Sequence, residues 1–337
     1  MDNAFPVGKL EMDFLSDLLS RYTGTDDRVA IGAKVGEDAA VVDFGDRYLV
    51  TKSNPITFAT NDIGWYVVNV CVNNMVVRGV RPRWMLNCVL LPENQTSPEM
   101  VEDIFKQIYA ASSKVGVLVI GGHTEVTSGL DRPIVVGHLL GELSKDRLVE
   151  TSTAQVGDTL IVTKALGVEG TAIIASELTE DLANKGCSAE FIKRAREFLR
   201  EPGISVYTEA LVAADSKLVS AMTDATEGGL ATALHEMAAA AGVGFRVKSE
   251  DVPLYPETRR ICAEYDLDPF GLIASGMLIM TVPVANVDEL CNKMRTESVQ
   301  CSVIGTVTDA SEGVRISREG KSSALPYFAV DELTKIM

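Results

Sequence analysis

The segment Gly121-Gly122-His123-Thr124-Glu125 combines residue types that can do chemistry, and it directly follows the apolar run Val115–Ile120. Paired glycines allow positive φ angles and let the backbone approach a ligand closely. The side chains that follow them are types that bind phosphate, metal ions or protons. We interpret the segment as a turn after a buried strand, with Pro133–Leu140 as the returning strand, and as the floor of an active site. A plain β-turn between two core strands is the alternative.

A second candidate group lies nearer the N-terminus. Asp38 stands among small residues in Gly36–Val42 and suits a contact with Mg²⁺ or phosphate, although an ordinary acidic turn would look the same. Tyr48–Thr51 is predicted to be a strand, and Lys52–Thr57 is expected to leave it because Pro55 favours a break.

The segment Ile63–Arg78 is predicted to be a helix that stops at Gly79. Polar residues recur along one stripe of this valine-rich helix, at Asp62, Tyr66, Asn69 and Asn73. A solvent-facing stripe would be unusually narrow, and buried amides need hydrogen-bond partners. A ligand or a second subunit is therefore expected to supply them.

The turn Ala221–Gly229 precedes the alanine-rich helix Leu230–Ala241. Asp224 or Thr226 is expected to cap this helix, so that Gly228, Gly229 and the first-turn N–H groups face an anion. A similar glycine loop, Lys164–Gly170, follows the predicted strand Thr159–Thr163 and is a weaker phosphate-binding signal.

Arg83–Leu91 is predicted to be a strand, and Ser97–Val115 a helix with Met100, Ile104, Ile108 and Ala111 on its buried face. Strands and helices alternate irregularly along the chain, which predicts an α+β fold. The length of 337 residues favours two domains, and the polar segment Glu150–Asp158 suggests domains at residues 1–152 and 153–337.

Charge and composition narrow the choice of partners. The 31 Lys and Arg residues stand against 47 Asp and Glu, a net charge of −16, and no basic run is present. Nucleic acid and anionic membranes are therefore poor partners. The six scattered cysteines lack metal-ligand spacing and resemble reduced core residues. With no signal-peptide pattern at the N-terminus and no apolar run of membrane-spanning length, a cytoplasmic protein is expected.

Taken together, the motifs resemble the AIR synthase superfamily over nearly the whole chain. The residues that carry the resemblance are Gly36-x-Asp38-Ala39-Ala40-Val41, Asn54-Pro-Ile-Thr57, Asp62-Ile-Gly64, Asn73-Asn74-Met-x-x-x-Gly79-x-x-Pro82, Gly121-Gly122-His-Thr124-Glu125, Thr223-Asp224-x-Thr226-x-Gly228-Gly229-Leu230, Asp268-Pro269 and Ser275-Gly276.

The resemblance implies an N-terminal α/β sandwich whose sheet joins that of a second subunit in a barrel, and a C-terminal α/β domain beside it. It implies ATP and Mg²⁺ as cofactors, a homodimer, and phosphorylation of an amide, carbonyl or similar oxygen of a small substrate. Positioning and charge neutralisation would be the protein's contribution to this reaction.

By the same resemblance, Lys52, His123 and Glu125 are the candidate catalytic residues, and Asp38 and Glu125 the candidate metal ligands. The candidate residues for ATP or phosphate are Asp38, Asn54, Asp62, Asn73, Asn74, Gly121, Gly122, Thr124, Asp224, Thr226, Gly228 and Gly229.

Three positions depart from the family pattern. Asn54, Asn74 and His123 stand where the family commonly has acidic residues, and a neutral amide is a weaker Mg²⁺ ligand than a carboxylate. This motivates a second hypothesis, a catalytically weakened relative that binds a nucleotide or metabolite and acts in regulation or assembly. The hydrogenase-maturation members end in a substrate-carrying cysteine, whereas this chain ends in Glu332–Met337, so their thiocyanate-forming reaction is not expected.

Overall fold

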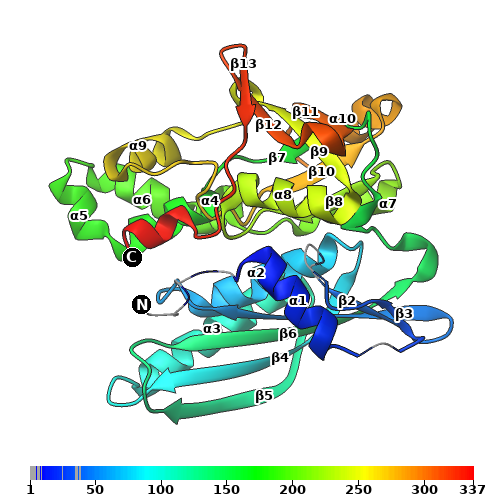
Figure 1. Cartoon of the computed structure of the whole chain (residues 1–337). Coiled ribbons are helices and arrows are strands. Elements are labelled where there is room, and N and C mark those ends of the chain that lie inside the picture. The colour runs from blue at the N-terminus through cyan, green and yellow to red at the C-terminus, as the bar shows by residue number, and fades with distance from the viewer. Residues whose placement is uncertain (1–4, 6–7, 9, 25, 35–36, 38) are drawn as a thin grey trace. The chain divides into compact units, whose positions relative to one another are not determined.

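The computed structural model describes residues 5, 8, 10–24, 26–34, 37 and 39–337 (Figure 1). By their contacts, the residues group into two compact units. One unit comprises Asp27–Gly32 and Asp38–Leu148, and the other comprises Met1–Asp26, Ala33–Glu37 and Val149–Met337. We call them the N-terminal and C-terminal units and describe each by itself.

The N-terminal unit is built on a six-stranded sheet in the order β1-β2-β3-β6-β4-β5. Neighbouring strands run antiparallel except β4 and β5, which are parallel. The strands are β1 (Val29–Ile31), β2 (Ala40–Asp43), β3 (Arg47–Ile56), β4 (Arg81–Pro92), β5 (Leu118–Thr127) and β6 (Ile134–Ser144).

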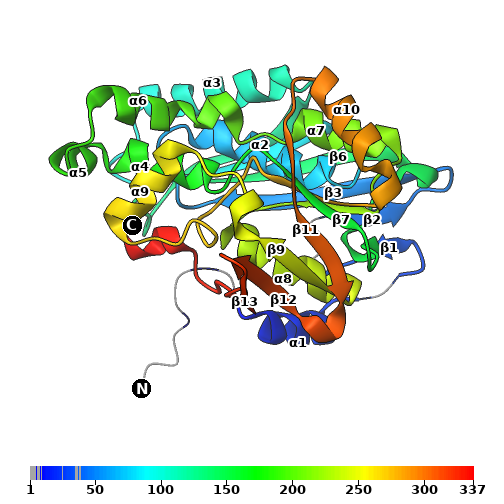
Figure 2. The same cartoon turned by 90° about the horizontal axis from the view of Figure 1, so that it is seen from above.

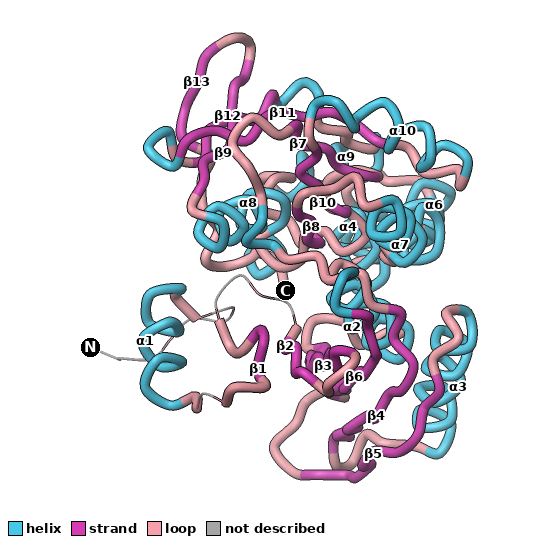
Figure 3. The backbone as a smooth tube through the Cα atoms, turned by 90° about the vertical axis from the view of Figure 1, so that its right-hand side faces the viewer, coloured by secondary structure: helices cyan, strands magenta, loops and turns pink. Residues whose placement is uncertain are grey.

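Two helices, α2 (Ile63–Val76) and α3 (Pro98–Lys114), lie on one side of this sheet (Figure 3). Both helices were predicted from the sequence and are confirmed. Ser97 caps α3 by accepting a hydrogen bond from the N–H of Met100, and Ile104, Ile108 and Ala111 form its buried face. In α2, Tyr66, Asn69 and Asn73 are buried, which rules out a solvent-facing polar stripe.

Strand β3 continues through Pro55 to Ile56, so the expected break after Thr51 is wrong. Pro55 lacks an N–H group, but β2 pairs with β3 only as far as Thr51. Beyond that point one edge of β3 is free of β2, and a strand edge without a partner tolerates proline. The other edge of β3 remains paired with β6.

The C-terminal unit contains a seven-stranded sheet in the order β13-β12-β9-β11-β7-β10-β8. Only β9 and β12 are parallel neighbours. The strands are β7 (Thr159–Thr163), β8 (Ala221–Asp224), β9 (Val243–Lys248), β10 (Leu278–Val282), β11 (Cys301–Asp309), β12 (Val314–Arg318) and β13 (Lys321–Ala324). Residues Leu160–Thr163 of β7, an interior strand between β11 and β10, are all buried.

Helices of the C-terminal unit pack in two groups. One contains α4, α6 and α9 in mutual contact, and α7 lies beside α10 (Figure 2). A core of α8 and strand residues includes Leu234, Met237 and Phe245. The helices are α1 (Met12–Tyr22), α4 (Val168–Glu177), α5 (Thr179–Asn184), α6 (Ala189–Glu197), α7 (Tyr207–Ser216), α8 (Gly229–Ala241), α9 (Pro256–Tyr265) and α10 (Val287–Thr296).

Short helical turns complete both units, at Lys145–Arg147, Thr151–Thr153, Leu199–Gly203, Ser249–Asp251, Val284–Asn286, Ala310–Glu312 and Glu332–Lys335. The chain from Leu325 onward, red in Figure 1, runs back along α8. His235 bonds to the carbonyl of Leu325 at 2.9 Å, and the hydroxyl of Thr232 donates to the carbonyl of Phe328 at 3.1 Å. We call Leu325–Ile336 the C-terminal strap.

Candidate functional site

The segment Gly121–Glu125 lies inside strand β5 and is not a turn, so that prediction is wrong. The expectation of a buried strand is wrong as well. Leu118 and Ile120 are 65% and 58% exposed, and Val126 is 56% exposed. The reason is that β5 is an edge strand paired with β4 alone, so its apolar side chains have no second neighbour in the sheet.

Strand alternation divides this motif between the two faces of the sheet. Gly122 and Thr124 pair with the buried residues Asn87 and Val89 and share their face, on the side of α2 and α3. His123 and Glu125 point to the opposite face, where their side chains hydrogen bond at 3.2 Å. Both side chains are largely open to solvent, 66% and 48% exposed.

Gly122 is required by close packing of the backbone. Its φ is +150°, and a Cβ atom there would lie 2.0 Å from the carbonyl oxygen of Asn87. At Gly121 the nearest atom would be a methyl of Leu86 at 3.7 Å, an ordinary contact. Packing against the backbone of β4 therefore requires glycine at Gly122 but not at Gly121.

One row across the sheet joins several of the predicted site residues. The register aligns Asn54 on β3, Gly137 on β6, Asn87 on β4 and Gly122 on β5. Lys52 lies two residues before Asn54 on the same face, close enough to the buried Cys71 of α2 to lower the pKa of its thiol, although burial raises that pKa to about 12. Lys52, Asn54, Gly122 and Thr124 thus share one side of the sheet.

Asn87 was not identified from the sequence. It is 7% exposed, and its side-chain oxygen has no hydrogen-bond partner in the part of the chain that the structure describes. Since buried amides normally have partners, this position needs a ligand or ordered water to satisfy it. One sequence signal could have identified Asn87: it is a polar residue at a core-facing position of the predicted strand Arg83–Leu91.

Other predicted residues are not brought together. Lys52 on β3 and His123 on β5 are separated by β6 and β4, roughly 14 Å at the usual strand spacing, and lie on opposite faces. Asp62 precedes α2, whereas Asn73 and Asn74 are buried near its other end, roughly 17 Å away at 1.5 Å per residue. Asp38 lies outside the described residues.

In the C-terminal unit, three loops are joined by backbone hydrogen bonds. Ala274 donates to the carbonyl of Thr226, Ala231 to Phe270, and Gly170 to Ile273, at 3.0 to 3.3 Å. The loops are Lys164–Gly170, Thr223–Gly229 and Asp268–Gly276. The second and third loops carry the family-like motifs of this half of the sequence, and the first is the weaker glycine-loop signal.

The expected cap of α8 by Asp224 or Thr226 is wrong. Gly228 occupies the N-cap position with φ +75° and offers no side chain. Its N–H donates to the carboxylate of Asp331 at 2.6 Å, and the N–H of Gly229 donates to the carbonyl of Thr226 at 3.0 Å. Glycine suits these two positions because the turn has positive φ angles and brings the backbone close to its neighbours. The N–H groups of both glycines already have hydrogen-bond partners inside the protein.

Two buried carboxyl groups lie beside this turn. Burial raises the pKa of Glu169 to about 7 and that of Asp331 to about 6, and the nearby carboxylate of Glu227 acts in the same direction on both. Glu169 accepts a hydrogen bond from the N–H of Ser275 at 3.1 Å. The surroundings of Gly228 are therefore acidic, and no local sequence pattern indicates that either carboxyl group is buried.

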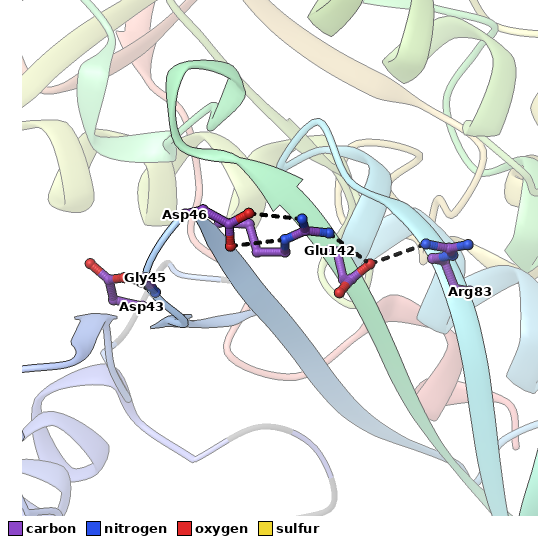
Figure 4. Close-up of polar contacts among 6 residues, drawn as sticks. Asp43, Gly45, Asp46, Arg83 and Glu142 are labelled. Carbon is purple, nitrogen blue, oxygen red and sulfur yellow. Dashed lines mark hydrogen bonds and ion pairs between the residues drawn. The ribbon is translucent and has the colours of Figure 1, made fainter.

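At the sheet end formed by β3, β6 and β4, charged side chains form a chain of ion pairs (Figure 4). Arg47 bonds Asp46 at 2.8 Å and approaches Glu142 at 3.5 Å, and Arg83 bonds Glu142 at 3.1 Å. They surround an open hollow of about 300 Å³ that Leu143 and Ser144 complete. Among the described residues, no predicted site residue lines it. Exposed ion pairs of this kind contribute little stability.

The predicted metal site is not assembled by the described residues alone. Among them, no group of three or more His, Cys, Asp and Glu side chains is placed to hold a metal ion. Glu125 has His123 as its partner. A magnesium site here would depend on Asp38.

In the part of the chain that the structure describes, no helix has both the length and the apolar character needed to cross a membrane.

Comparison with protein families identifies the class of protein. Residues 36–143 match the N-terminal domain of AIR synthase related proteins, and residues 155–317 match the C-terminal domain. The chain therefore belongs to the AIR synthase-related family, and the resemblance read from its motifs is confirmed.

Its relatives include proteins of hydrogenase expression or maturation and a kinase. A hydrogenase expression/formation protein of Methanocaldococcus jannaschii is 28% identical over 92% of this chain and 91% of the relative. The carbamoyl dehydratase HypE of Rhodobacter capsulatus is 29% identical, covering 88% and 86%. The thiamine-monophosphate kinase of Pyrococcus horikoshii is 28% identical, covering 89% and 91%.

Solved structures share the fold. The hydrogenase maturation protein HypE of E. coli matches with a TM-score of 0.74 at 22% identity, covering 96% of this chain and 98% of the other. A HypE structure in complex with ATP matches with a TM-score of 0.71 at 22% identity, covering 89% and 90%. The predicted two-domain α+β fold is thereby confirmed.

Proposed function

We propose that the protein is an ATP-dependent enzyme of the AIR synthase and HypE type that phosphorylates an amide or carbonyl oxygen of a small substrate. The observation that carries the proposal is the match of both family domains, in order, to relatives that include a carbamoyl dehydratase and a kinase. A structure of the same fold has been solved with ATP, which supports the choice of nucleotide.

In this reaction the γ-phosphoryl group leaves ADP and joins the acceptor oxygen. The protein's part is positioning and charge neutralisation, and the ammonium group of Lys52 is the cation we assign to phosphate. Asn54 lies on the same face of β3 as Lys52 and is assigned to the same ligand. Gly122 and Thr124 share this side of the sheet but lie on β5, across β6 and β4, so their ATP assignment stays a prediction. ATP binding stays a prediction for Gly121, Asp62, Asn73 and Asn74.

Magnesium, when bound, would neutralise phosphate charge, with Asp38 as its proposed ligand. Glu125 was predicted as a second ligand, but it points to the opposite face of the sheet from Lys52 and Asn54 and pairs with His123, so we do not assign it to the same metal in this chain. We also assign the protein to the cytoplasm and to a homodimer. The dimer assignment is supported by the exposed apolar edge strand β5.

The second candidate is a nucleotide- or metabolite-binding protein with little or no turnover. It is favoured by the neutral residues Asn54, Asn74 and His123. Asn74 is 3% exposed, so an acidic residue in this position would have to bury its charge.

Two measurements separate the enzyme from the binding protein. They are calorimetry with Mg-ATP and then an assay of ADP release with candidate amide and carbonyl substrates. Binding with ADP release supports the enzyme. Tight binding without release for any substrate supports the second candidate, and absence of nucleotide binding contradicts both.

The metal assignment has its own test. Asp38→Ala should abolish Mg-ATP binding while the circular dichroism spectrum and thermal unfolding stay unchanged. Asp43→Ala is the matched control, because Asp43 is exposed and pairs with Lys145 at 2.5 Å. If Asp38→Ala binds with wild-type affinity, the assignment of Asp38 to the metal is wrong.

A further inference from the structure

The side chains of His123 and Glu125 are metal-binding types that lie away from the proposed phosphate ligands. They stand two residues apart on β5, on the face of the sheet opposite Lys52, and Nε2 of His123 lies 3.2 Å from Oε2 of Glu125. Imidazole nitrogen and carboxylate oxygen are ligands of Zn²⁺, usually in sets of four. Among the described residues of one chain, no group of three or more such ligands is formed. The pair is therefore half of a zinc site.

The strand that carries this pair is open on one side. β5 forms the edge of its sheet and pairs with β4 alone (Figure 1). The side chains of His123 and Glu125 are 66% and 48% exposed, and Val126 beside them is 56% exposed. The unpaired N–H and C=O groups of an edge strand are a template for pairing with another strand. A second copy of the chain supplies an identical edge, with a second His123 and Glu125.

The shape of β5 favours one register for the pairing of two copies. Ile120 has no counterpart on β4, so the regular part of the strand is Gly121–Thr127. Identical strands related by a two-fold axis run antiparallel, and full pairing of this segment puts Thr124 of one copy opposite Thr124 of the other. Each His123 then lies opposite the Glu125 of the other copy. A slide of two residues that set the two Glu125 carboxylates opposite each other would be unfavourable.

In this register four ligands meet on one face of the joined sheet. Directly opposite side chains of antiparallel strands have Cβ atoms about 4.5–5.5 Å apart, and alternate residues along one strand are about 6.6 Å apart. Two imidazoles and two carboxylates at the corners of such a rectangle can reach a single ion with bonds of about 2.0–2.2 Å. The two carboxylate charges balance the charge of Zn²⁺, so the assembled site is neutral.

We propose that, in the homodimer assigned above, on which the site depends, His123 and Glu125 of both copies bind one Zn²⁺ ion between the β5 strands. The magnesium ion proposed for ATP binding is a different ion, because Mg²⁺ prefers oxygen ligands whereas imidazole suits Zn²⁺. An ion that binds the dimer and not the monomer stabilises the dimer by mass action. The strength of the dimer therefore depends on zinc.

The test uses the full chain, stripped of metal with EDTA, dialysed and titrated with Zn²⁺ in the absence of nucleotide. Calorimetry should give one ion for every two chains. Analytical ultracentrifugation should show the dissociation constant of the dimer falling roughly a hundredfold at a zinc concentration about 100 times the dissociation constant of the site. Mg²⁺ at the same concentration should not tighten the dimer, and renewed addition of EDTA should reverse the effect of Zn²⁺.

Three variants locate the ligands. His123→Ala and Glu125→Gln should each form the metal-free dimer and lose its tightening by Zn²⁺, because one ligand type is missing from both halves of the site. His138→Ala is the matched control. His138 is also an exposed histidine on this face of the sheet, but it lies on β6, with β4 between it and β5. This variant should bind zinc and tighten as the wild type does.

Several results would overturn the proposal. They are binding of one ion per chain, a dimer that Zn²⁺ does not tighten, and tightening that survives in His123→Ala. A chain that stays monomeric at every zinc concentration would contradict the homodimer as well. None of these readings measures ADP release, so failure of the zinc site is distinguishable from failure of the proposed reaction.

Discussion

Asp331 in the C-terminal strap accepts a hydrogen bond from the backbone N–H of Gly228 at 2.6 Å, across 103 residues of sequence. The same carboxylate accepts from the N–H of Leu333 at 2.8 Å, so one side chain fixes both the start of α8 and the turn that ends the chain. Next to it, Glu332 accepts from the N–H of Asp268 at 2.8 Å. The strap is thus hydrogen bonded to two of the three joined loops of the C-terminal unit, Thr223–Gly229 and Asp268–Gly276.

Replacing Asp331 tests this arrangement directly. Asp331→Ala leaves the buried N–H of Gly228 without its acceptor and should lower the free energy of unfolding by about 1–3 kcal/mol. Asp331→Asn retains an oxygen acceptor, so its free energy of unfolding should fall by less than that of the alanine variant. Chemical denaturation gives the free energies, and hydrogen exchange should show faster exchange of the Gly228 amide in the alanine variant. Unchanged protection of this amide would mean that Asp331 does not hold the turn.

The raised pKa of Glu169 predicts a pH-dependent stability. The unfolded carboxyl titrates at about 4.3, whereas burial keeps the folded one protonated up to about pH 7. The stabilising contribution of the protonated group is therefore complete below about pH 4.3 and is lost as the pH rises through about 7. Glu169→Gln, which keeps an acceptor for Ser275 without a charge, should be more stable than wild type by roughly 2–4 kcal/mol at pH 8 and by much less at pH 5.

Urea unfolding at the two pH values measures this difference. Glu209→Gln is the matched control, because it leaves the buried ammonium group of Lys164 without its carboxylate and should destabilise the protein at both pH values. An equal effect of Glu169→Gln at pH 5 and pH 8 would mean that Glu169 does not hold a proton in the folded state.

Helices and buried strands could be predicted from the sequence because their signals are local. The helix α3 follows from the cap at Ser97 and the spacing of Ile104, Ile108 and Ala111, and the predicted strand Thr159–Thr163 is β7. The motifs also identified the family correctly.

What could not be predicted depends on distant partners. An apolar run ending in two glycines has the same pattern in a buried strand as in β5, whose exposure results from its place at the sheet edge. The acceptor for Gly228 comes from Asp331, which no local pattern connects to the turn. Asn87 was missed because Arg83–Leu91 was predicted to be a strand without regard to the face on which each residue lies. Asn54 was placed after a break that the strand does not make.

The two glycines of β5 provide a paired test of the packing between β4 and β5. Gly122→Ala would place a Cβ atom 2.0 Å from the carbonyl oxygen of Asn87 and should cost at least about 2 kcal/mol of stability. Gly121→Ala meets only Leu86 at 3.7 Å and should stay within about 0.5 kcal/mol of wild type. Thermal and urea unfolding compare the two. Equal stability of the two variants would show that β5 can shift away from β4 at little cost.

The exposed edge strand β5 predicts self-association of the chain. Leu118 and Val126 are 65% and 56% exposed on a strand whose outer edge is unpaired within the sheet, and such an edge is a template for pairing with another strand. We expect the wild type to sediment as a dimer at micromolar concentration. The double variant Leu118→Lys, Val126→Lys should sediment as a monomer, because burying two ammonium groups on this edge opposes pairing. Val303→Lys, a change of the same kind at a 47% exposed position of β11, should remain dimeric. A monomeric wild type, or a double variant that stays dimeric, would contradict pairing through β5.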